Sequence, residues 1–322
     1  MAFFLAPGHH SAYIHTTMDT IFLRNVLIVT KARVPEAEDL GTVIAKWMRE
    51  RCLEVNIIPA EQGSVLYNDP ELDLIVVLGG DGTILGVARH VIGRKIPLVC
   101  INFGRVGFLS DIEPDSWEEG LSAMLRSRDY RSAAGLRWTL LRYGHHVAGG
   151  YAVNDVVLSR SAMARLVYAD IYTDGELMGA VRADGFLLST AIGSSGYSVS
   201  ANGPLLFPTL NALAFVPICP FLNTIPPMVF PCHTVFRFHL LPGTTESYLT
   251  VDGQEGHLMQ TNDIVEIEGI PDCVRFLGKG LSFIERLRTR SFILQNPLNY
   301  RDKRETPPRL QDVSEQKTGS QS

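Results

Sequence analysis

The sequence lacks the cysteine patterns that accompany disulfide frameworks and zinc sites. Its 322 residues contain five cysteines, an odd number, with no Cys-x-x-Cys pair and no Cys/His cluster at zinc-ligand spacing. Most of these cysteines lie in apolar runs, where a free thiol behaves as a small hydrophobic side chain. Because reduced thiols are typical of the cytosol, we expect a cytoplasmic protein, and we expect no metal site built by the protein alone.

The chain also has little excess charge of either sign. It contains 29 lysines and arginines against 34 aspartates and glutamates, and its formal net charge is −5. Proteins that bind nucleic acid usually carry a basic surplus. The composition therefore argues against a nucleic-acid partner.

Long hydrophobic runs are missing as well. A helix that crosses a bilayer needs about 20 apolar residues, and prolines interrupt the apolar segment 212–231. The N-terminus is apolar for only about five residues and has no basic region, unlike a signal peptide. We therefore expect no membrane partner. Residues 1–19 read as a loose leader and the polar residues 297–322 as a disordered tail.

The first part of the chain alternates between strand patterns and helix patterns. The expected strands cover residues 24–30, 55–58, 73–78 and 97–101, and the expected helices cover residues 35–52, 83–92 and 116–126. Strands that alternate with helices indicate a parallel sheet covered on both faces. This part predicts an α/β nucleotide-binding domain over residues 20–130.

From about residue 130 the pattern changes to strands separated by turn residues. The expected strands cover residues 137–143, 151–159, 166–173, 234–240, 247–252, 263–268 and 273–277. The fold class is therefore an α/β N-terminal domain with a parallel sheet, plus a β-rich, sandwich-like domain at residues 131–280. A C-terminal return segment is expected at residues 281–296.

One glycine-rich turn indicates phosphate chemistry. Gly79-Gly80-Asp81-Gly82-Thr83 follows the apolar run 74–78, and a helical pattern follows the turn. Such a turn lets backbone N–H groups and a helix dipole face an anion at close range. It also places the carboxylate of Asp81 where it can take a proton from an attacking hydroxyl, or orient that hydroxyl. A plain strand-to-helix turn is the alternative.

Two common phosphate motifs do not describe this turn. A Walker loop is excluded because no Gly-Lys-Ser/Thr follows. A dinucleotide fingerprint is excluded because Thr30-Lys31-Ala32-Arg33 stands after the first strand, where glycines are needed. If the turn binds phosphate, it therefore does so as neither of these two motifs.

Two further segments place polar groups near strand ends. Asn102-Phe103-Gly104-Arg105-Val106-Gly107-Phe108-Leu109 is a loop at the sheet edge that carries the first motif, the edge where open α/β sheets bind ligands. A packed glycine turn is its alternative. Asn154-Asp155 interrupts an apolar strand and could hold ribose hydroxyls and adenine nitrogens, since buried polar groups need partners. An Asx turn is the alternative there.

The longest motif runs from Arg182 to Pro204. It combines the turn Asp184-Gly185 with a loop of small and hydroxyl-bearing residues around Ser195–Ser200. Small residues permit close backbone approach, and Tyr197 supplies a stacking face. A low-complexity linker is disfavoured because Phe186-Leu187-Leu188 anchors the loop to a core.

Taken in order, these motifs resemble the NAD kinase family. That family is similar in its Gly-Gly-Asp-Gly-Thr turn, its Asn-x-Gly-x-x-Gly-Phe-Leu loop, its Asn-Glu pair and its Asp-Gly turn with the hydroxyl-rich loop that follows. Its later Asp-Gly-Gln is matched by Asp252-Gly253-Gln254. The resemblance covers roughly residues 24–290 and implies the NAD kinase/diacylglycerol kinase-like fold, with a site between an α/β domain and a β-rich, NAD-binding domain.

The resemblance implies transfer of the terminal phosphate of ATP, or of polyphosphate, to the 2′-hydroxyl of the adenosine ribose of NAD. Asp81 would be the catalytic base, and a divalent cation (Mg²⁺) would arrive with the donor. The implied phosphate loop is Gly79, Gly80, Gly82 and Thr83. The implied NAD-binding residues are Asp81, Gly82, Asn154, Asp155, Arg165, Arg182, Asp184, Ile192, Ser195, Gly196, Tyr197, Ser198, Val199, Ser200 and Gln254. The family also implies a homo-oligomer, a dimer or a tetramer.

Several residues depart from the family's pattern, among them Asn202, which stands for a glycine, and the four that follow. Asp155 stands for a glutamate, Ile192 for a threonine, Gly196 for an alanine, and Phe221 for a histidine near the phosphates. A lost ligand hydrogen bond typically costs about 0.5–1.5 kcal/mol, so affinity or donor preference can change. Two alternatives stay open: a dinucleotide-binding protein with weak or no catalysis, and a lipid kinase of the same fold.

Overall fold

The computed structural model describes residues 12–15, 20–62, 66–104, 107–126, 129–161, 165–223, 225–244, 246–278, 282–289 and 292. The chain divides into two units, residues 1–283 and residues 284–322. The second unit contains most of helix α5 (Phe283–Thr289). The expected tail, residues 297–322, lies outside the described residues.

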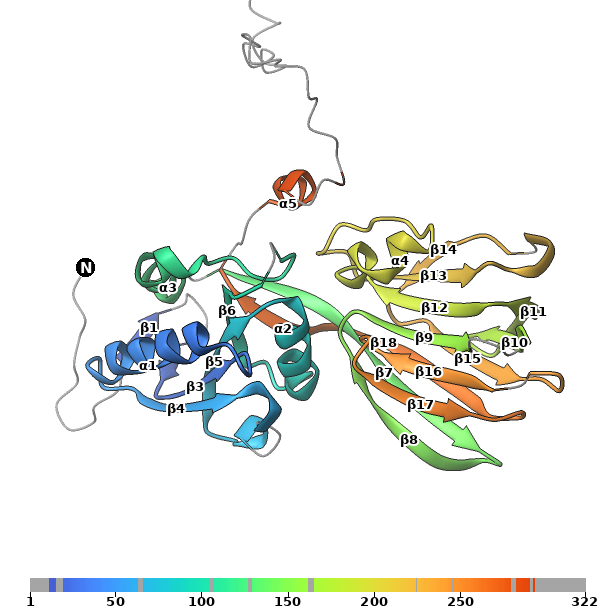
Figure 1. Ribbon diagram of the computed structural model, residues 1–322, viewed down its shortest axis with the longest axis horizontal. Helices are drawn as coiled ribbons and strands as arrows, with labels where there is room; N and C mark the ends of the chain where they lie inside the picture. Colours follow the sequence, from blue (N-terminus) through green and yellow to red (C-terminus); the bar gives the residue numbers. More distant parts are fainter. Residues whose placement is uncertain are drawn as a thin grey trace, which may run out of the picture. The chain divides into compact units, whose positions relative to one another are not determined.

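The first half of the large unit is a parallel sheet with helices on both faces (Figure 1). Its strands are β3 (Asn25–Thr30), β4 (Glu54–Pro59), β5 (Leu72–Gly79) and β6 (Pro97–Asn102), in the order β6-β5-β3-β4. Its helices are α1 (Pro35–Arg49), α2 (Asp81–Ala88) and α3 (Trp117–Arg126). The alternation of strand and helix predicted this arrangement, and it is confirmed.

Alternate residues of the parallel strands face two different cores, as strand geometry requires. Ile28 and Val76 pack with Ile44 of α1 and Leu121 of α3. Neighbouring residues such as Val77 pack with α2 on the opposite face. The carboxyl ends of β3, β5 and β6 therefore share one edge, with α2 starting at that edge.

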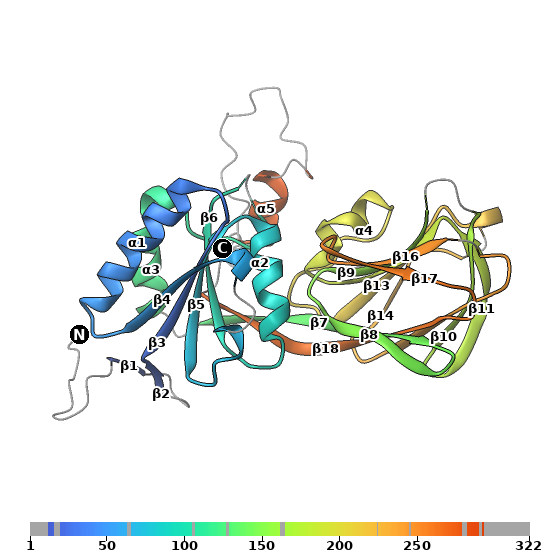
Figure 2. The ribbon, with the colours of Figure 1, turned by 60° about the horizontal axis from the view of Figure 1, so that its bottom comes forward.

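The second half is a sandwich of two antiparallel layers (Figure 2). Its strands are β7 (Tyr130–Arg142), β8 (His145–Ala152), β9 (Asp155–Arg160), β10 (Val167–Thr173), β11 (Glu176–Ala183), β12 (Gly185–Thr190), β13 (Ala212–Ile218), β14 (Met228–Pro231), β15 (Val235–Leu240), β16 (Ser247–Val251), β17 (Glu255–Met259) and β18 (Ile264–Leu277). One layer has the order β14-β13-β12-β9-β16-β17. Trp138, Phe186, Phe215 and Phe238 fill the core between the layers.

The other layer continues into the parallel sheet of the first half. It contains β11, β10, β15 and β18, with β7 and β8 paired beside β18. Strand β18 also pairs in parallel with β6, through Arg275 and Pro97 and through Phe276 and Leu98. One sheet of the described chain therefore runs through both halves.

Shorter elements complete the described part of the chain. Helix α4 covers Tyr197–Ser200, and 3₁₀ turns lie at Ala60–Gln62, Leu66–Asn68, Arg89–Val91, Pro114–Ser116, Gly193–Ser195 and Phe221–Asn223. Among the described residues, no helix combines the length and apolar character that a bilayer crossing requires.

Several strand expectations need correction. The strand expected at 151–159 is two strands, because β8 ends at Ala152 and β9 begins at Asp155. The strands expected at 263–268 and 273–277 are one strand, β18, with a register shift between Ile270 and Val274. Residues 176–183 form β11, which was not expected because much of it is exposed and carries a glycine.

The N-terminal leader contains paired structure where a loose segment was expected. Strand β1 (Ala12–His15) pairs antiparallel with β2 (Thr20–Leu23). Tyrosine, isoleucine and phenylalanine favour strands, which accounts for the pairing. The rest of residues 1–19 lies outside the described residues, and the domain boundaries stay predictions.

Candidate active site

The glycine turn after β5 is closely packed by backbone. A Cβ atom on Gly104 would lie 3.0 Å from Cα of Gly80, and a Cβ atom on Gly79 would lie 2.5 Å from Cβ of Thr83. Gly80 adopts extended backbone, and α2 begins at the next residue, Asp81. The first N–H groups of a helix have no partner inside the helix, so this turn offers donors to an anion.

The carboxylate of Asp81 is held by the second glycine loop. Its Oδ2 accepts the N–H of Phe108 at 2.9 Å, and its Oδ1 accepts the N–H of Leu109 at 3.2 Å. A Cβ atom on Gly107 would lie only 2.4 Å from Oδ1 of Asp81, so a larger residue here would force that carboxylate to shift. The first two motifs therefore meet at the sheet edge where the sequence predicted them.

A positive charge lies at the same edge. The N–H of Lys31 donates to the carbonyl of Leu78 at 2.8 Å. Nζ of Lys31 donates to the carbonyl of Phe103 at 3.3 Å, and the N–H of Phe103 donates to the carbonyl of Gly79 at 3.2 Å. The lysine side chain thus reaches from the end of β3 across to the loop after β6. The sequence patterns did not single out this residue as a ligand.

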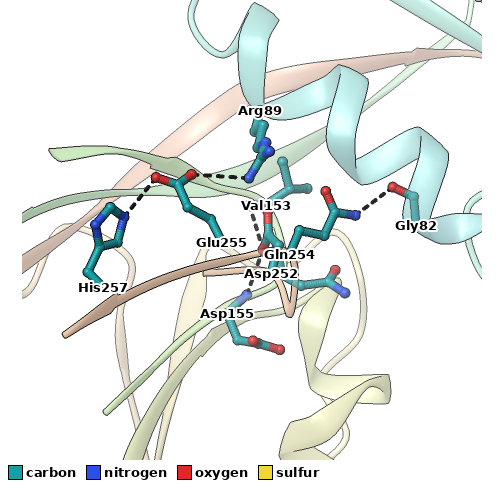
Figure 3. Close-up of polar contacts among 9 residues, drawn as sticks. Gly82, Arg89, Val153, Asp155, Asp252, Gln254, Glu255 and His257 are labelled. Atoms are coloured by element: carbon teal, nitrogen blue, oxygen red, sulfur yellow. Dashed lines mark hydrogen bonds and ion pairs between the residues drawn. The ribbon is translucent and has the colours of Figure 1, made fainter. Parts of the chain in front are cut away.

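Asp252 organises the segment that carries Asn154 and Asp155 (Figure 3). Its buried carboxylate accepts the N–H groups of Val153 at 2.9 Å, Asn154 at 2.7 Å and Asp155 at 3.1 Å. These bonds take the N–H groups away from strand pairing, which explains the break between β8 and β9. Burial raises the pKa of Asp252, although the three N–H donors oppose that shift.

Asp155 is a second buried carboxyl group beside the first. It is 6% exposed. Burial, and then the charge of Asp252, raise the pKa of Asp155 to about 7. A carboxyl group with such a pKa is partly protonated near neutrality, so it can donate as well as accept a hydrogen bond.

The loop after β12 is fastened to Asn154. The carbonyl of Asn154 accepts the N–H of Thr190 at 2.9 Å and the hydroxyl of Ser189 at 3.2 Å. A Cβ atom on Gly193 would lie 2.1 Å from that carbonyl oxygen, so only glycine fits. Ile192, Ser195 and Gly196 lie in this same loop. A Cβ atom on Gly196 would lie 3.7 Å from Nδ2 of Asn154.

Gln254 joins the two halves of the large unit at the start of α2 (Figure 3). Its Nε2 donates to the carbonyl of Gly82 at 2.6 Å. The turn 252–254 therefore touches both the helix that carries Asp81 and the segment that carries Asn154 and Asp155. The structure brings these predicted residues into one neighbourhood.

Three predicted NAD-binding residues lie elsewhere in the chain. Asp184 precedes β12, and its Oδ1 lies 2.5 Å from Nε of Arg160. Arg182 lies over the ring of Tyr168 at 4.5 Å, and Arg165 is exposed. Strand β12 separates Asp184 from Thr190, and six residues of strand span about 20 Å. Within one chain, Asp184 and the nearby Arg182 therefore lie about the length of β12 away from the loop that is bonded to Asn154.

Some of the predicted NAD-binding residues of helix α4 lie at the surface, and others lie in the interior. Tyr197 and Ser200 line a cavity of about 330 Å³ together with Asn202, Pro217 and Cys219. Val199 is half-buried. Ser198 is fully buried, and its Oγ has no hydrogen-bond partner among the described residues. The hydroxyl of Ser198 therefore faces the interior rather than a ligand.

The family-pattern departures can now be placed. Phe221 is 56% exposed, in a turn after β13.

The described residues contain no group of three or more His, Cys, Asp or Glu side chains that could hold a metal ion. At the start of α2 the site offers the oriented carboxylate of Asp81, the ammonium group of Lys31 and a helix N-terminus. These groups suit transfer of a phosphoryl group to a hydroxyl.

Comparisons with known proteins agree with this chemistry. A family model described as ATP-NAD kinase N-terminal domain matches residues 60–130, and one described as ATP-NAD kinase C-terminal domain matches residues 153–277. An NAD kinase of Nitratidesulfovibrio vulgaris (strain DSM 19637 / Miyazaki F) is 40% identical over 275 residues, covering 84% of this chain and 97% of the relative. An NAD kinase of Lawsonia intracellularis is 32% identical over 281 residues, covering 86% and 99%.

Two solved structures share the fold. Yeast NADH kinase complexed with NADH has a TM-score of 0.72 and 23% identity, covering 95% of this chain and 96% of that one. An NAD kinase from Archaeoglobus fulgidus in complex with ATP has a TM-score of 0.67 and 24% identity, covering 82% and 99%. At these identities the likeness shows the fold alone.

Proposed function

The chain belongs to the NAD kinase family, whose reaction is the ATP-dependent phosphorylation of NAD to NADP, and we propose that Asp81 directs this reaction here. The observation that supports this role is the position of its carboxylate. Two N–H groups of the Gly107–Leu109 loop fix it at the N-terminus of α2, beside the glycine turn. A fixed carboxylate next to an anion site can aim a hydroxyl at a phosphorus atom.

The proposed chemistry is one displacement. A secondary hydroxyl is a poor nucleophile, so Asp81 accepts the proton of the ribose 2′-hydroxyl as the oxygen attacks the γ-phosphorus. The new bond joins the 2′-oxygen to that phosphorus. The bond from phosphorus to the bridging oxygen breaks, and ADP leaves. N–H groups of the glycine turn and the dipole of α2 offset charge on the phosphoryl oxygens.

The donor is proposed to enter as ATP carrying a divalent cation, Mg²⁺, so the metal is part of the substrate. Lys31 adds a fixed positive charge at the same sheet edge, since its Nζ lies 3.3 Å from the carbonyl of Phe103. An ammonium group commonly binds phosphate as a point charge. Lys31 is therefore our candidate for contact with the donor phosphates.

NAD recognition is proposed to centre on Asn154 and Asp155. Both follow the bend that Asp252 imposes, and both adjoin the loop that carries Ile192 and Ser195. Asp155 is shorter than the glutamate of the family pattern. Its raised pKa, about 7, lets it donate a hydrogen bond to a ribose oxygen.

A homo-oligomer, a dimer or a tetramer, remains part of the proposal. Arg182 and Asp184 are separated from the Asn154 segment by the length of β12. A neighbouring copy of the chain can bring them to a dinucleotide bound near Asp81. A cytoplasmic location is also proposed, and the five free cysteines support it.

The test is NADP formation from NAD, ATP and Mg²⁺ by the purified protein. Parallel reactions replace ATP with polyphosphate, or NAD with lipid vesicles that contain diacylglycerol. NADP formation with either donor is expected. Phosphorylated lipid without NADP would select the lipid kinase, and calorimetric NAD binding without turnover would select the binding protein.

A further inference from the structure

The turn that links β16 and β17 is bonded to both sides of the candidate site. Asp252, its first residue, holds the N–H groups of Val153 to Asp155. Gln254, its third residue, donates to the carbonyl of Gly82 in α2. The turn 252–255 therefore connects the segment Val153–Asp155 to the helix that begins at Asp81.

Gln254 lies along one face of α2 near its start. Its Nε2 is 2.6 Å from the carbonyl oxygen of Gly82. A Cβ atom on Gly86 would lie 3.3 Å from its Oε1. Positions 82 and 86 are four residues apart, so both face the same side of the helix. The two glycines of α2, Gly82 and Gly86, thus make room for the Gln254 side chain.

Glu255 holds the other end of the same helix (Figure 3). Its Oε2 lies 3.4 Å from Nη1 of Arg89, the residue that caps the C-terminus of α2. Its Oε1 lies 2.8 Å from Nε2 of His257. The ring of His257 lies 4.9 Å from that of Trp138, which is fully buried in the sandwich core. The carboxylate is therefore supported from the β-rich half.

The helix α2 is thus fixed at two points by neighbouring residues of one turn. The apolar face of α2, through Ile84 and Val87, packs in a cluster that also contains Val153 and Val274 of the β-rich half. Apolar contacts are non-directional. The hydrogen bond from Gln254 at the start of α2 and the ion pair of Glu255 at its end add contacts that have a direction.

We propose that Gln254 and Glu255 are positioning residues that clamp α2 and thereby set the place of Asp81 relative to Asn154 and Asp155. The proposal rests on the proposed function, because its effect is on phosphoryl transfer. The two residues need not touch substrate in this role. A misplacement of about 1 Å in a reacting geometry can cost about 100-fold in rate, so such a clamp has a measurable effect.

Charge exchange across the Arg89–Glu255 pair tests the clamp. The proteins are Arg89→Glu, Glu255→Arg and the double exchange, each assayed for kcat and for the KM of ATP and of NAD. Each single variant should lower kcat about tenfold, and the double variant should restore kcat to within about threefold of the wild type. Both KM values should change by less than about twofold.

The exposed pair Arg24–Glu54 supplies the matched control. Nη2 of Arg24 lies 3.1 Å from Oε1 of Glu54, and both side chains are well exposed. Glu54→Arg should leave kcat unchanged. Single variants of the clamp with wild-type kcat would overturn the proposal, even if their melting temperatures fall. A double variant whose loss equals the product of the single losses would overturn it too.

Gln254 is tested separately with Gln254→Glu, which keeps the size and removes the donor to Gly82. A lower kcat with an unchanged KM for NAD is expected. A raised KM for NAD with normal kcat would show that Gln254 binds the dinucleotide directly, and would overturn its role in the clamp.

Failure of the proposed function is distinguishable from failure of the clamp. Wild-type protein that forms no NADP would overturn the function. Coupling between Arg89 and Glu255 would then be read from urea unfolding of the same four proteins, and the absence of coupling there would overturn the clamp.

Discussion

Two hydrogen bonds join Asp155 and Asp252, one between their backbones and one from the backbone of Asp155 to the side chain of Asp252. The N–H of Asp252 donates to the carbonyl of Asp155 at 2.9 Å, and the N–H of Asp155 donates to Oδ1 of Asp252 at 3.1 Å. The two residues are 97 positions apart in the sequence. This reciprocal contact joins the start of β9 to the end of β16, so the segment that carries Asn154 and Asp155 is bonded directly to the turn 252–255.

Asp252→Asn should destabilise the protein. The amide group keeps one acceptor oxygen, and its NH₂ group faces N–H donors that the carboxylate accepts. Losing charged acceptors in a buried site should lower the free energy of unfolding by about 2–3 kcal/mol, measured by urea unfolding. Asp174→Asn is the control, because its exposed carboxylate accepts one N–H, from Val235. Equal effects of the two changes would contradict the prediction.

The raised pKa of Asp155, about 7, makes stability depend on pH. The folded state binds the proton more tightly than the unfolded state, whose carboxyl titrates near 3.8. The stabilising contribution is therefore fully present below about pH 4 and is lost as pH rises toward about 7. Asp155→Asn should remove this loss, so its unfolding free energy should fall less than that of the wild type between about pH 5 and about pH 8. Parallel pH profiles of the two proteins would refute this account.

Asp81→Asn should abolish turnover while sparing the binding of NAD. General-base catalysis is typically worth about 10²–10⁴-fold, so kcat should fall by about that factor. Isothermal titration should give an NAD affinity within about threefold of the wild type, because the amide keeps the size of the carboxylate and its oxygen still accepts one of the two N–H groups that hold it. Retained turnover would remove Asp81 from the reaction.

Gly107→Ala should displace the Asp81 carboxylate. The new methyl group would meet Oδ1 of Asp81 at 2.4 Å and Oγ of Ser110 at 2.9 Å. We expect kcat to fall by about tenfold or more from misplacement of this group. Gly256→Ala, where a Cβ atom meets nothing within 4 Å, is the control and should keep its activity. A wild-type kcat in Gly107→Ala would show that Asp81 tolerates the shift.

Lys31→Met should weaken the binding of the phosphate donor and leave the binding of NAD unaffected. Removing one positive charge from the donor site should raise the KM for ATP about tenfold, while the KM for NAD stays within about twofold. Lys46→Met, on the exposed face of α1, is the control. A rise in the KM for NAD alone would place Lys31 on the acceptor side.

The sequence predicted the first half of the fold well, because its signals are local. Apolar runs such as residues 74–78 end at glycines, and the stripe that contains Ile44 and Met48 has helical spacing. Those patterns depend on neighbours a few residues apart. Strand β11 was hidden because an edge strand can expose most of its side chains.

The candidate site was predicted only in part, for a related reason. The roles proposed for Asp81 and Asn154 rest on interrupted apolar patterns close to them. The role of Asp252 cannot be read from its own segment, because its carboxylate accepts an N–H group that lies 99 positions away in the sequence. An Asp-Gly turn with a positive φ, as at Asp252, is a local feature shared with ordinary hairpins. Only the folded chain shows which carboxylate is buried against which backbone.

The parallel pairing of β18 with β6 has a consequence for biosynthesis. Strand β6 is complete at Asn102, yet the start of one of its two edges, at Pro97 and Leu98, pairs with β18, which ends at Leu277. A ribosome must therefore translate most of the polypeptide before that edge is closed. Until then, the nascent N-terminal sheet presents unpaired backbone, which is the kind of surface that chaperones and neighbouring chains recognise.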